Sequence, residues 1–318
     1  MNCRPHTESF WLASLMVIVA ALAYCSVAIS AEAAKEPSKS EFFRQPVKGV
    51  MADVTPARQT DESVSRHDVV ELLAVDSGFN WAKNVFFRTP IWNLQFKYKP
   101  VRMVWVDVPQ KSGKMRRKPI YYMVYSVTNL PLAKQKSKPP QFGWMVPVKD
   151  EDGTFKVKYE DRPIRFIPRF LLESPEFGKV YTDRVIPLAL GAIRAREDRL
   201  LPDWVDKKGA VPRSPIQTTV DIAGEMKVGE TRWGVATWED LDPRIDRFSI
   251  YVHGLTNAYK WSDTKGAYKK GDEIGTGRRL SRKTLKLNFW RPGDEFYERE
   301  DEIRRGVPGE VDYEWVYQ

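Results

Sequence analysis

Cysteine and histidine are scarce in this sequence, and their scarcity excludes several chemistries. The 318 residues include two cysteines, Cys3 and Cys25, and three histidines. Because no cysteine follows residue 25, the rest of the chain has no thiol for a disulfide, a nucleophile or a zinc ligand. A histidine general base is also nearly excluded, since His67 and His253 are the only histidines after the N-terminal segment.

Motifs of catalysis and nucleotide binding are missing as well. There is no G-x-S-x-G nucleophile elbow, and residues 271–277 lack the spacing and the Lys-Ser/Thr end of a phosphate loop. Ser262 and Lys265 have the S-x-x-K spacing of serine acyl-enzymes but no companion motif, so we interpret the match as chance. We therefore nominate no catalytic residue and predict no cofactor, no nucleotide and no bound metal.

Only one long apolar run is present, from Phe10 to Tyr24, behind a short polar start with Arg4. This pattern predicts an export signal, and a small-x-small site at its end predicts a cleaved signal peptide of residues 1–33. Residues 10–30 are also long enough to cross a bilayer, which takes about 20 residues, so an uncleaved anchor is the alternative. We expect the protein in the periplasm or at the cell surface, or in the membrane if the signal remains.

The stretch after the signal has no globular pattern. Residues 34–65 are polar, dotted with proline and aperiodic, which predicts a flexible tether. Lipid attachment at Cys25 is disfavoured, because the bulky Tyr24 stands where a small residue should precede a modified cysteine.

Positive charge is in excess. The net charge is +9 at pH 7, and loss of residues 1–33 removes one cation and two anions, which raises it to +10. This charge favours an anionic envelope polymer or a membrane surface as partner, and we do not expect nucleic acid. Five cations near a predicted hairpin turn form a candidate polyanion site, with an ordinary solvated turn as the alternative. They are Lys111, Lys114, Arg116, Arg117 and Lys118.

Strand patterns dominate the remainder of the chain. Residues 120–127 are apolar on both faces, which predicts a strand inside a packed sheet. The best helix is predicted at 187–198, with Pro187 at its start. Alternating apolar residues predict half-buried strands, the first with Trp92 facing inward. These strands lie at 92–96, 248–253 and 285–289.

The segment 201–215 has three prolines and a glycine and is predicted to be a linker. The parts on either side, 66–200 and 216–318, each contain a strand, a polar turn and an aromatic strand that ends in Thr-Asn. We therefore predict a mainly β protein made of two β-sandwich-like, immunoglobulin-like units with one or two short helices. One mixed sheet is the alternative.

An acidic loop at residues 239–247 separates two of the predicted strands. Its carboxylates belong to Glu239, Asp240, Asp242 and Asp246. They lack the ligand spacing and the glycine of a calcium loop. We interpret the loop as a hairpin connection whose aspartates bond their own backbone and are neutralised by Arg244 and Arg247, with a bound cation as the alternative.

Four segments carry a family resemblance. They are WNLQFKYKPVRMVWVDVP, YYMVYSVTN, GVATWEDLDPRIDRFSIYVHGLTN and RKTLKLNFWRPGDEF. In these segments the chain resembles uncharacterised exported β-rich proteins of planctomycete-type bacteria. The resemblance implies a signal peptide and a shared β-rich body, and it implies no catalytic residue.

Together these patterns predict a non-enzymatic binding or structural module of the cell envelope, with an anionic polymer, a membrane surface or a partner protein as its target. Ten tryptophans after residue 33 offer flat apolar faces suited to polysaccharide. Tyr251 and His253 share a wet strand face and are candidate ligand contacts, with ordinary solvated residues as the alternative. The alternative function is a carbohydrate-active hydrolase, whose pair of carboxylates about 5 to 9 Å apart the sequence does not identify.

Overall fold

The structure is a computed structural model. It describes residues 52–54, 90–149, 155–198, 216–267, 269–273, 275–291 and 303–318. All of them belong to one compact unit, residues 44–318. The predicted signal at 1–33 and the predicted linker at 201–215 lie outside these residues. Within the described ranges, no helix has the length and apolar character needed to span a bilayer.

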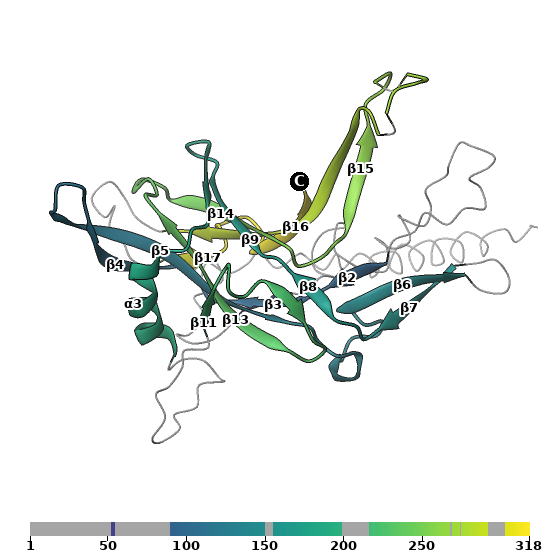
Figure 1. Ribbon diagram of the computed structural model, residues 1–318, viewed down its shortest axis with the longest axis horizontal. Helices are drawn as coiled ribbons and strands as arrows, with labels where there is room; N and C mark the ends of the chain where they lie inside the picture. The colour runs from purple at the N-terminus through teal and green to yellow at the C-terminus, as the bar shows by residue number, and fades with distance from the viewer. Residues whose placement is uncertain are drawn as a thin grey trace, which may run out of the picture. The chain divides into compact units, whose positions relative to one another are not determined.

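The protein is mainly β, as predicted, and most of its strands belong to two large sheets (Figure 1). The first, the central sheet, has the strand order β1–β3–β5–β13–β11, and β4 also pairs with β5. Its strands are β1 (Ala52–Val54), β3 (Gln95–Tyr98), β4 (Arg102–Pro109), β5 (Met115–Thr128), β11 (Ile216–Thr218) and β13 (Thr231–Glu239).

The second, the outer sheet, has the strand order β10–β9–β14–β16–β15, and β17 and β18 also pair with β16. Its strands are β9 (Arg169–Ser174), β10 (Lys179–Thr182), β14 (Arg247–His253), β15 (Tyr259–Asp263), β16 (Arg278–Trp290), β17 (Arg304–Arg305) and β18 (Tyr313–Tyr317).

Two smaller sheets and one α-helix complete the described part of the chain. The smaller sheets are formed by β2 (Ile91–Asn93), β6 (Gly143–Lys149) and β7 (Phe155–Glu160), and by β8 (Ile164–Phe166) and β12 (Gly224–Met226). The helix is α3 (Pro187–Glu197), and a 3-10 turn, η2, covers Leu132–Lys134. The predicted helix is confirmed, with Pro187 in its first turn, where a missing N–H costs nothing.

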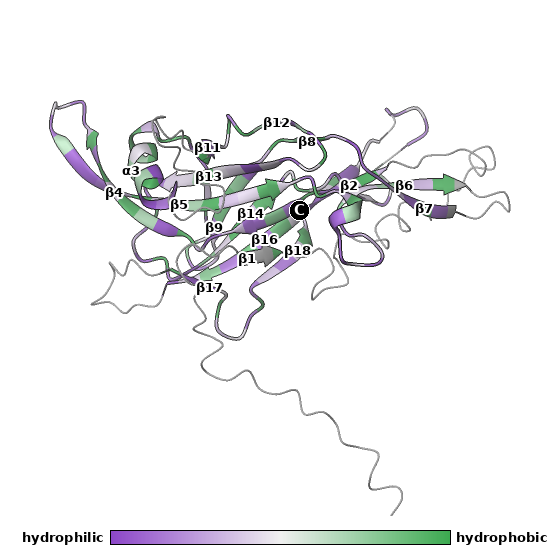
Figure 2. Ribbon diagram, turned by 90° about the horizontal axis from the view of Figure 1, so that it is seen from below, coloured by the Kyte–Doolittle hydropathy of each residue, from purple (hydrophilic) through white to green (hydrophobic). Residues whose placement is uncertain are grey.

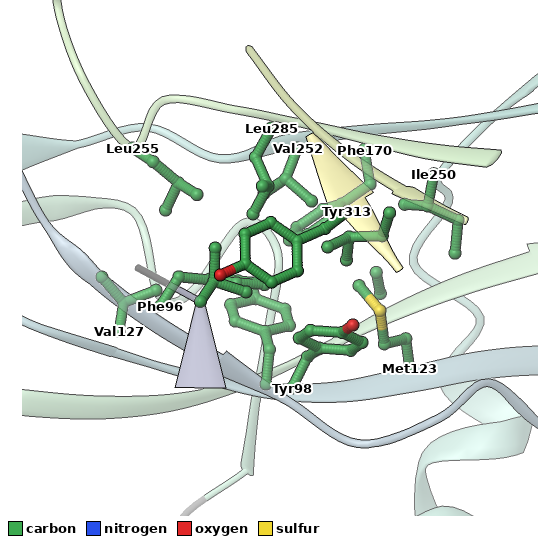
Figure 3. Packing of buried hydrophobic residues seen from close by; sticks show 14 of the residues in the cluster. Phe96, Tyr98, Met123, Val127, Phe170, Ile250, Val252, Leu255, Leu285 and Tyr313 are labelled. Carbon is green, nitrogen blue, oxygen red and sulfur yellow. The ribbon is translucent and has the colours of Figure 1, made fainter. Parts of the chain in front are cut away.

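The central and outer sheets share one apolar core, which makes the fold sandwich-like. Tyr98 of β3 packs edge-on against Phe289 of β16, with ring centroids 6.0 Å apart. The ring centroids of Tyr125 in β5 and Phe170 in β9 are 4.8 Å apart. Figure 3 shows side chains of both sheets pointing toward one another in this core. The immunoglobulin-like strand order stays a prediction.

β5 is buried on both faces, as its sequence predicts. Met123, Tyr125 and Val127 face the core between the sheets. Ile120, Tyr122 and Val124 face a second core, which α3 covers with Ala189 and Ile193. Burying each such side chain stabilises the folded state by about 1.5 to 3 kcal/mol. Because β5 contributes side chains to both cores, it links them.

The sheets do not follow the predicted division into units 66–200 and 216–318. β13 pairs with β5 over nine residues, and β14 pairs with β9, so each of the two large sheets combines strands from both parts. The predicted tether also needs correction, because β1 pairs with β3 and Val54 is buried. A three-residue edge strand is too short to show a period in the sequence.

The acidic loop is not a hairpin connection, and that prediction is wrong. β13 belongs to the central sheet and β14 to the outer sheet, so residues 240–246 carry the chain from one sheet to the other. β13 is buried from Trp233 to Trp238. The apolar pattern of a strand is the same whether the next strand along the chain is its neighbour or a member of the opposite sheet, so the sequence does not distinguish the two connections.

The predicted inward faces of β14 and β16 are confirmed. Buried residues on these faces are Phe248, Ile250 and Val252, and Leu285, Leu287 and Phe289. The prediction fails at Trp92, which is partly exposed, whereas Asn93 is buried. The cause is a break at Leu94: its N–H donates to the carbonyl of Leu255, and β2 and β3 join different sheets.

Candidate functional site

The candidate site begins where the chain leaves β14. Residues 254–258, called the bulge segment here, depart from the edge of β16 before β15 resumes the pairing. Leu255 accepts a hydrogen bond from the N–H of Leu94, and Thr256 forms an isolated bridge with Asn93. The bulge segment therefore turns toward β2 and leaves a hollow beside the outer sheet.

Gly254 permits a close approach between the start of the bulge segment and the backbone of Ile167. Its φ is +88°, and a Cβ atom there would lie 2.2 Å from the carbonyl oxygen of Ile167. Only glycine fits, because the conformation is left-handed and the contact is with backbone. The link between β8 and β9, which includes Ile167, consequently forms the opposite wall of the hollow.

The hollow is a cleft of about 750 Å³. Cationic side chains come to it from three places in the sequence: Arg165 from β8, Arg169 from β9, and Arg282 and Lys283 from β16. None of the described residues that line it has an acidic side chain. The cleft therefore presents a positive field to a ligand.

Three of these cationic side chains are accessible to a ligand in the cleft. Arg165, Arg169 and Arg282 are exposed, and within the described part of the chain none of them forms an ion pair. Glu225 stands opposite Arg165 in the β12–β8 ladder without such a pair. Lys283 differs, since its side chain is buried and its Nζ lies 5.2 Å from the ring centroid of Tyr317.

His253, a predicted ligand contact, lines this cleft. It lies directly across the strands from Arg169. Burial, and then Arg169 and Arg282, lower the pKa of His253 below its ordinary value. The imidazole is therefore expected to be neutral at pH 7.

The hydrogen bonds of His253 indicate its tautomer. Its Nδ1 lies 3.1 Å from Oγ1 of Thr284, and that hydroxyl also donates to the carbonyl of Arg282. A hydroxyl has one hydrogen, so both contacts are satisfied when Nδ1–H donates to Thr284. Nε2 is then an acceptor, and it is buried without a partner among the described residues.

Tyr251, the second predicted contact, is not part of the cleft lining. It is half-buried, and burial together with a hydrogen bond to Glu173 raises its pKa. Its hydroxyl is therefore hydrogen-bonded within the outer sheet, to Glu173 of β9. The structure brings His253, and not Tyr251, to the cationic cleft.

The predicted polyanion site is spread over a strand and does not gather at a hairpin tip. The turn covers 110–114, and Arg116, Arg117 and Lys118 are already in β5. Successive side chains along a strand point to opposite faces, so these cations do not share one face. Figure 2 shows that the β4–β5 hairpin contains both hydrophilic and hydrophobic stretches. The guanidinium of Arg117 lies 5.6 Å from the ring centroid of Trp105, and the ammonium of Lys118 lies 2.9 Å from Asp240.

The acidic loop is neutralised by cations. Asp242 pairs with Arg244 and with Lys179, each at 2.9 Å. Hydrogen bonds from Arg244 and Lys179 hold its pKa far below the usual range. Its Oδ1 also accepts from the backbone N–H of Arg244, the turn contact that the sequence predicts. Among the described residues, no three His, Cys, Asp or Glu side chains are placed to hold a metal ion.

A second, smaller hollow of about 330 Å³ contains two glutamates, Glu176 and Glu310. The Oε2 atom of Glu176 accepts backbone hydrogen bonds from Asp246 and Arg247. Burial, followed by the charge of Glu176, raises the pKa of Asp246. Carboxylates therefore approach this hollow, in contrast to the cationic cleft.

Sequence reasoning nominated His253 but missed the three exposed arginines of the cleft. Arg169 and Arg282 are 113 positions apart, and no local motif connects them. The available signal was that each of them is a polar residue in a strand, on the face opposite to the buried apolar residues. Comparison with protein-family models, with curated protein sequences and with solved structures found no match.

Proposed function

We propose that this protein is a non-enzymatic binding module for an acidic polysaccharide of the cell envelope, and that the cleft beside His253 holds the sugar carboxylates. The observation that carries the proposal is the convergence of Arg165, Arg169 and Arg282 on a cleft with no acidic side chain among its described lining residues. Guanidinium groups bind carboxylates through two parallel hydrogen bonds, which gives both affinity and orientation.

Aromatic residues in the same lining support a sugar ligand. Trp92 and Tyr259 are partly exposed there. Their rings offer apolar faces with a polar edge, the surface that packs against the C–H face of a sugar ring. Apolar walls with a few charged anchors are typical of ligand sites.

The chemistry of the cleft favours binding over hydrolysis. A glycosidase needs two carboxylates, and the described lining supplies none. His253 is a poor general acid, because its low pKa keeps it neutral and its Nε2 is buried. The cleft can therefore hold an anion, but it lacks an acid–base pair.

The proposed location at the cell envelope rests on the N-terminal apolar run. A signal peptide of residues 1–33 would deliver the protein to the compartment where acidic polysaccharide is found. The intact mass of protein from its native source tests this step. A mass without residues 1–33 supports export with cleavage, and a full-length mass in the membrane fraction supports an anchor.

The binding test compares polygalacturonate with a neutral glucan by titration calorimetry. The double variant Arg169→Ala/Arg282→Ala should lose at least about tenfold in affinity for polygalacturonate, because two guanidinium contacts are removed. The matched control is Lys114→Ser/Arg116→Ser, which removes the same charge from β5 and its turn. Equal losses in the two variants would show only general charge attraction and would contradict the proposal.

A second candidate function belongs to the smaller hollow. Glu176 and Glu310 line it, and the raised pKa of Asp246 beside Glu176 resembles the environment of a carboxyl that donates a proton. A hydrolase would release reducing ends from polysaccharide, and Glu310→Gln would abolish that release. The variant Arg169→Ala/Arg282→Ala should leave such a reaction at the smaller hollow intact.

A further inference from the structure

The cleft opens onto a two-stranded ribbon, called the arm here, formed by β15 and residues 278–282 of β16. Figure 1 shows the arm extending away from the neighbouring strands of the outer sheet. Its register pairs Tyr259 with Arg282 and Trp261 with Leu280. Directly paired residues in a sheet lie on the same face, so these four side chains form a continuous stripe.

The stripe starts inside the cleft. Tyr259, Leu280 and Arg282 all belong to the cleft lining, and Trp261 is the next residue outward on the same face. Leu280 is 63% exposed and Trp261 is 37% exposed. An apolar surface therefore continues from the cationic cleft along the arm.

The outer end of the stripe is held in place and is neutral. The guanidinium of Arg278 lies 4.0 Å from the ring centroid of Trp261. Two hydrogen bonds, of 2.8 and 3.0 Å, join Arg278 to the carboxylate of Asp263. This arrangement restricts the indole and cancels the charge of Arg278, so the outer end of the stripe adds aromatic contact without adding net positive charge.

On the opposite face of the arm, the residues at the base pack against β18. The ammonium of Lys260 lies 4.3 Å from the ring centroid of Tyr317 in β18. Lys283, at the base of the arm, faces the same ring. The face that carries Trp261 and Leu280 is exposed and is the face that continues from the cleft lining.

We infer that the ligand is a linear acidic polymer that enters the cleft with one sugar and lays the following sugars along the arm. The inference rests on the proposed function and extends it from a single site to a series of subsites. From Arg282 to Arg278 the strand rises about 13 Å, which is more than one sugar ring spans. Carboxylates are bound in the cleft, and Trp261 and Leu280 contact the apolar faces of the following rings.

The test measures how affinity depends on ligand length, by titrating galacturonate oligomers of two and six sugars into the full protein. The hexamer should bind about tenfold more tightly than the dimer. In Trp261→Ala the gain with length should disappear while dimer affinity is unchanged. In Arg169→Ala/Arg282→Ala both oligomers should bind weakly.

A matched control is available in the β4–β5 hairpin. Trp105 is 40% exposed and also has an arginine, Arg117, against its ring. Trp105→Ala should retain the full length dependence. Circular dichroism of all variants confirms that none of them has lost the fold.

The outcomes separate the two proposals. If the dimer binds through Arg169 and Arg282 but the hexamer binds no better, the polymer inference is overturned and the proposed function stands. If neither oligomer binds, the proposed function fails first. Binding of phosphatidylglycerol vesicles that depends on Trp261, with no binding of either oligomer, would also overturn the inference and would identify the stripe as a lipid contact.

Discussion

His253 and Arg169 face each other across β14 and β9, and this pairing places a neutral imidazole beside an exposed guanidinium. The two side chains come from strands that the sequence assigned to different β-rich units, 66–200 and 216–318, and that are neighbours in the outer sheet. Both side chains line the cleft. The pairing also makes the protonation of His253 a reporter of the charge in the cleft.

The first prediction concerns this reporter. In NMR titrations, the pKa of His253 should lie below its ordinary value of 6.5, and Arg169→Ala/Arg282→Ala should raise it, because two positive charges are removed. The folded state then takes up this proton at a lower pH than the unfolded state. The contribution of His253 to stability is therefore complete above about pH 6.5 and declines as pH falls. An unchanged pKa in the double variant would contradict the electrostatic coupling.

The second prediction concerns Gly254. Gly254→Ala should lower the free energy of unfolding by about 2 to 4 kcal/mol, through the left-handed backbone and the clash with the carbonyl of Ile167. Gly266→Ala is the control, since Gly266 also has a positive φ but has nothing within 4 Å of its added Cβ. Chemical denaturation measures both. Equal losses would mean that the contact with Ile167 is unimportant.

The third prediction concerns Glu197, the buried carboxylate that joins α3 to the central sheet through hydrogen bonds. The carboxylate of Glu197 is fully buried and accepts hydrogen bonds from Lys99, Arg102 and Tyr122. Glu197→Gln leaves the buried Lys99 ammonium without a counter-charge and should cost about 3 to 5 kcal/mol.

The control for this change is Glu239→Gln, which breaks a solvent-exposed pair with Arg184 and should cost less than about 1 kcal/mol. Urea denaturation of both variants gives the comparison. A loss at Glu197 as small as the loss at Glu239 would show that the charge network does not stabilise the helix.

The fourth prediction concerns the hairpin cations. Replacing Lys111, Lys114 and Arg116 by serine should reduce the salt dependence of polygalacturonate binding only slightly, because the cleft supplies the specific contacts. Lys118 is kept, since it pairs with Asp240. Affinity measured across a salt series tests this. If the variant loses most of its affinity, the hairpin is the principal anion site and the cleft is secondary.

Local sequence pattern identified the apolar residues that are buried in β5, β14 and β16, although it failed at Trp92. Residues 120–127 have apolar side chains at every position but one, and both faces of β5 are covered. The predicted inward residues of β14 and β16 are buried, although Ser249, Thr284 and Asn288 on the other faces are buried as well. These outcomes follow from a period of two along a strand, which is a property of the chain itself.

The candidate site was only partly accessible to the same reasoning. His253 was found because it follows an alternating strand, but the arginines beside it carry no pattern that distinguishes them from other surface cations. Five cations near one turn looked like a site, yet the strand sends Arg117 and Lys118 to different partners. Proximity in sequence overstates proximity in space when the residues lie in a β-strand.

The sequence by itself determined a β-rich chain, the inward faces of its main strands and the position of its one described helix. Only the tertiary structure decided that β5 pairs with β13, that the acidic loop crosses between sheets, and that Arg169 meets His253. The reason is physical: every residue except proline offers the same backbone donor and acceptor, so hydrogen bonding does not select a partner strand. That choice depends on which arrangement buries the apolar faces together, and this is a property of the whole fold.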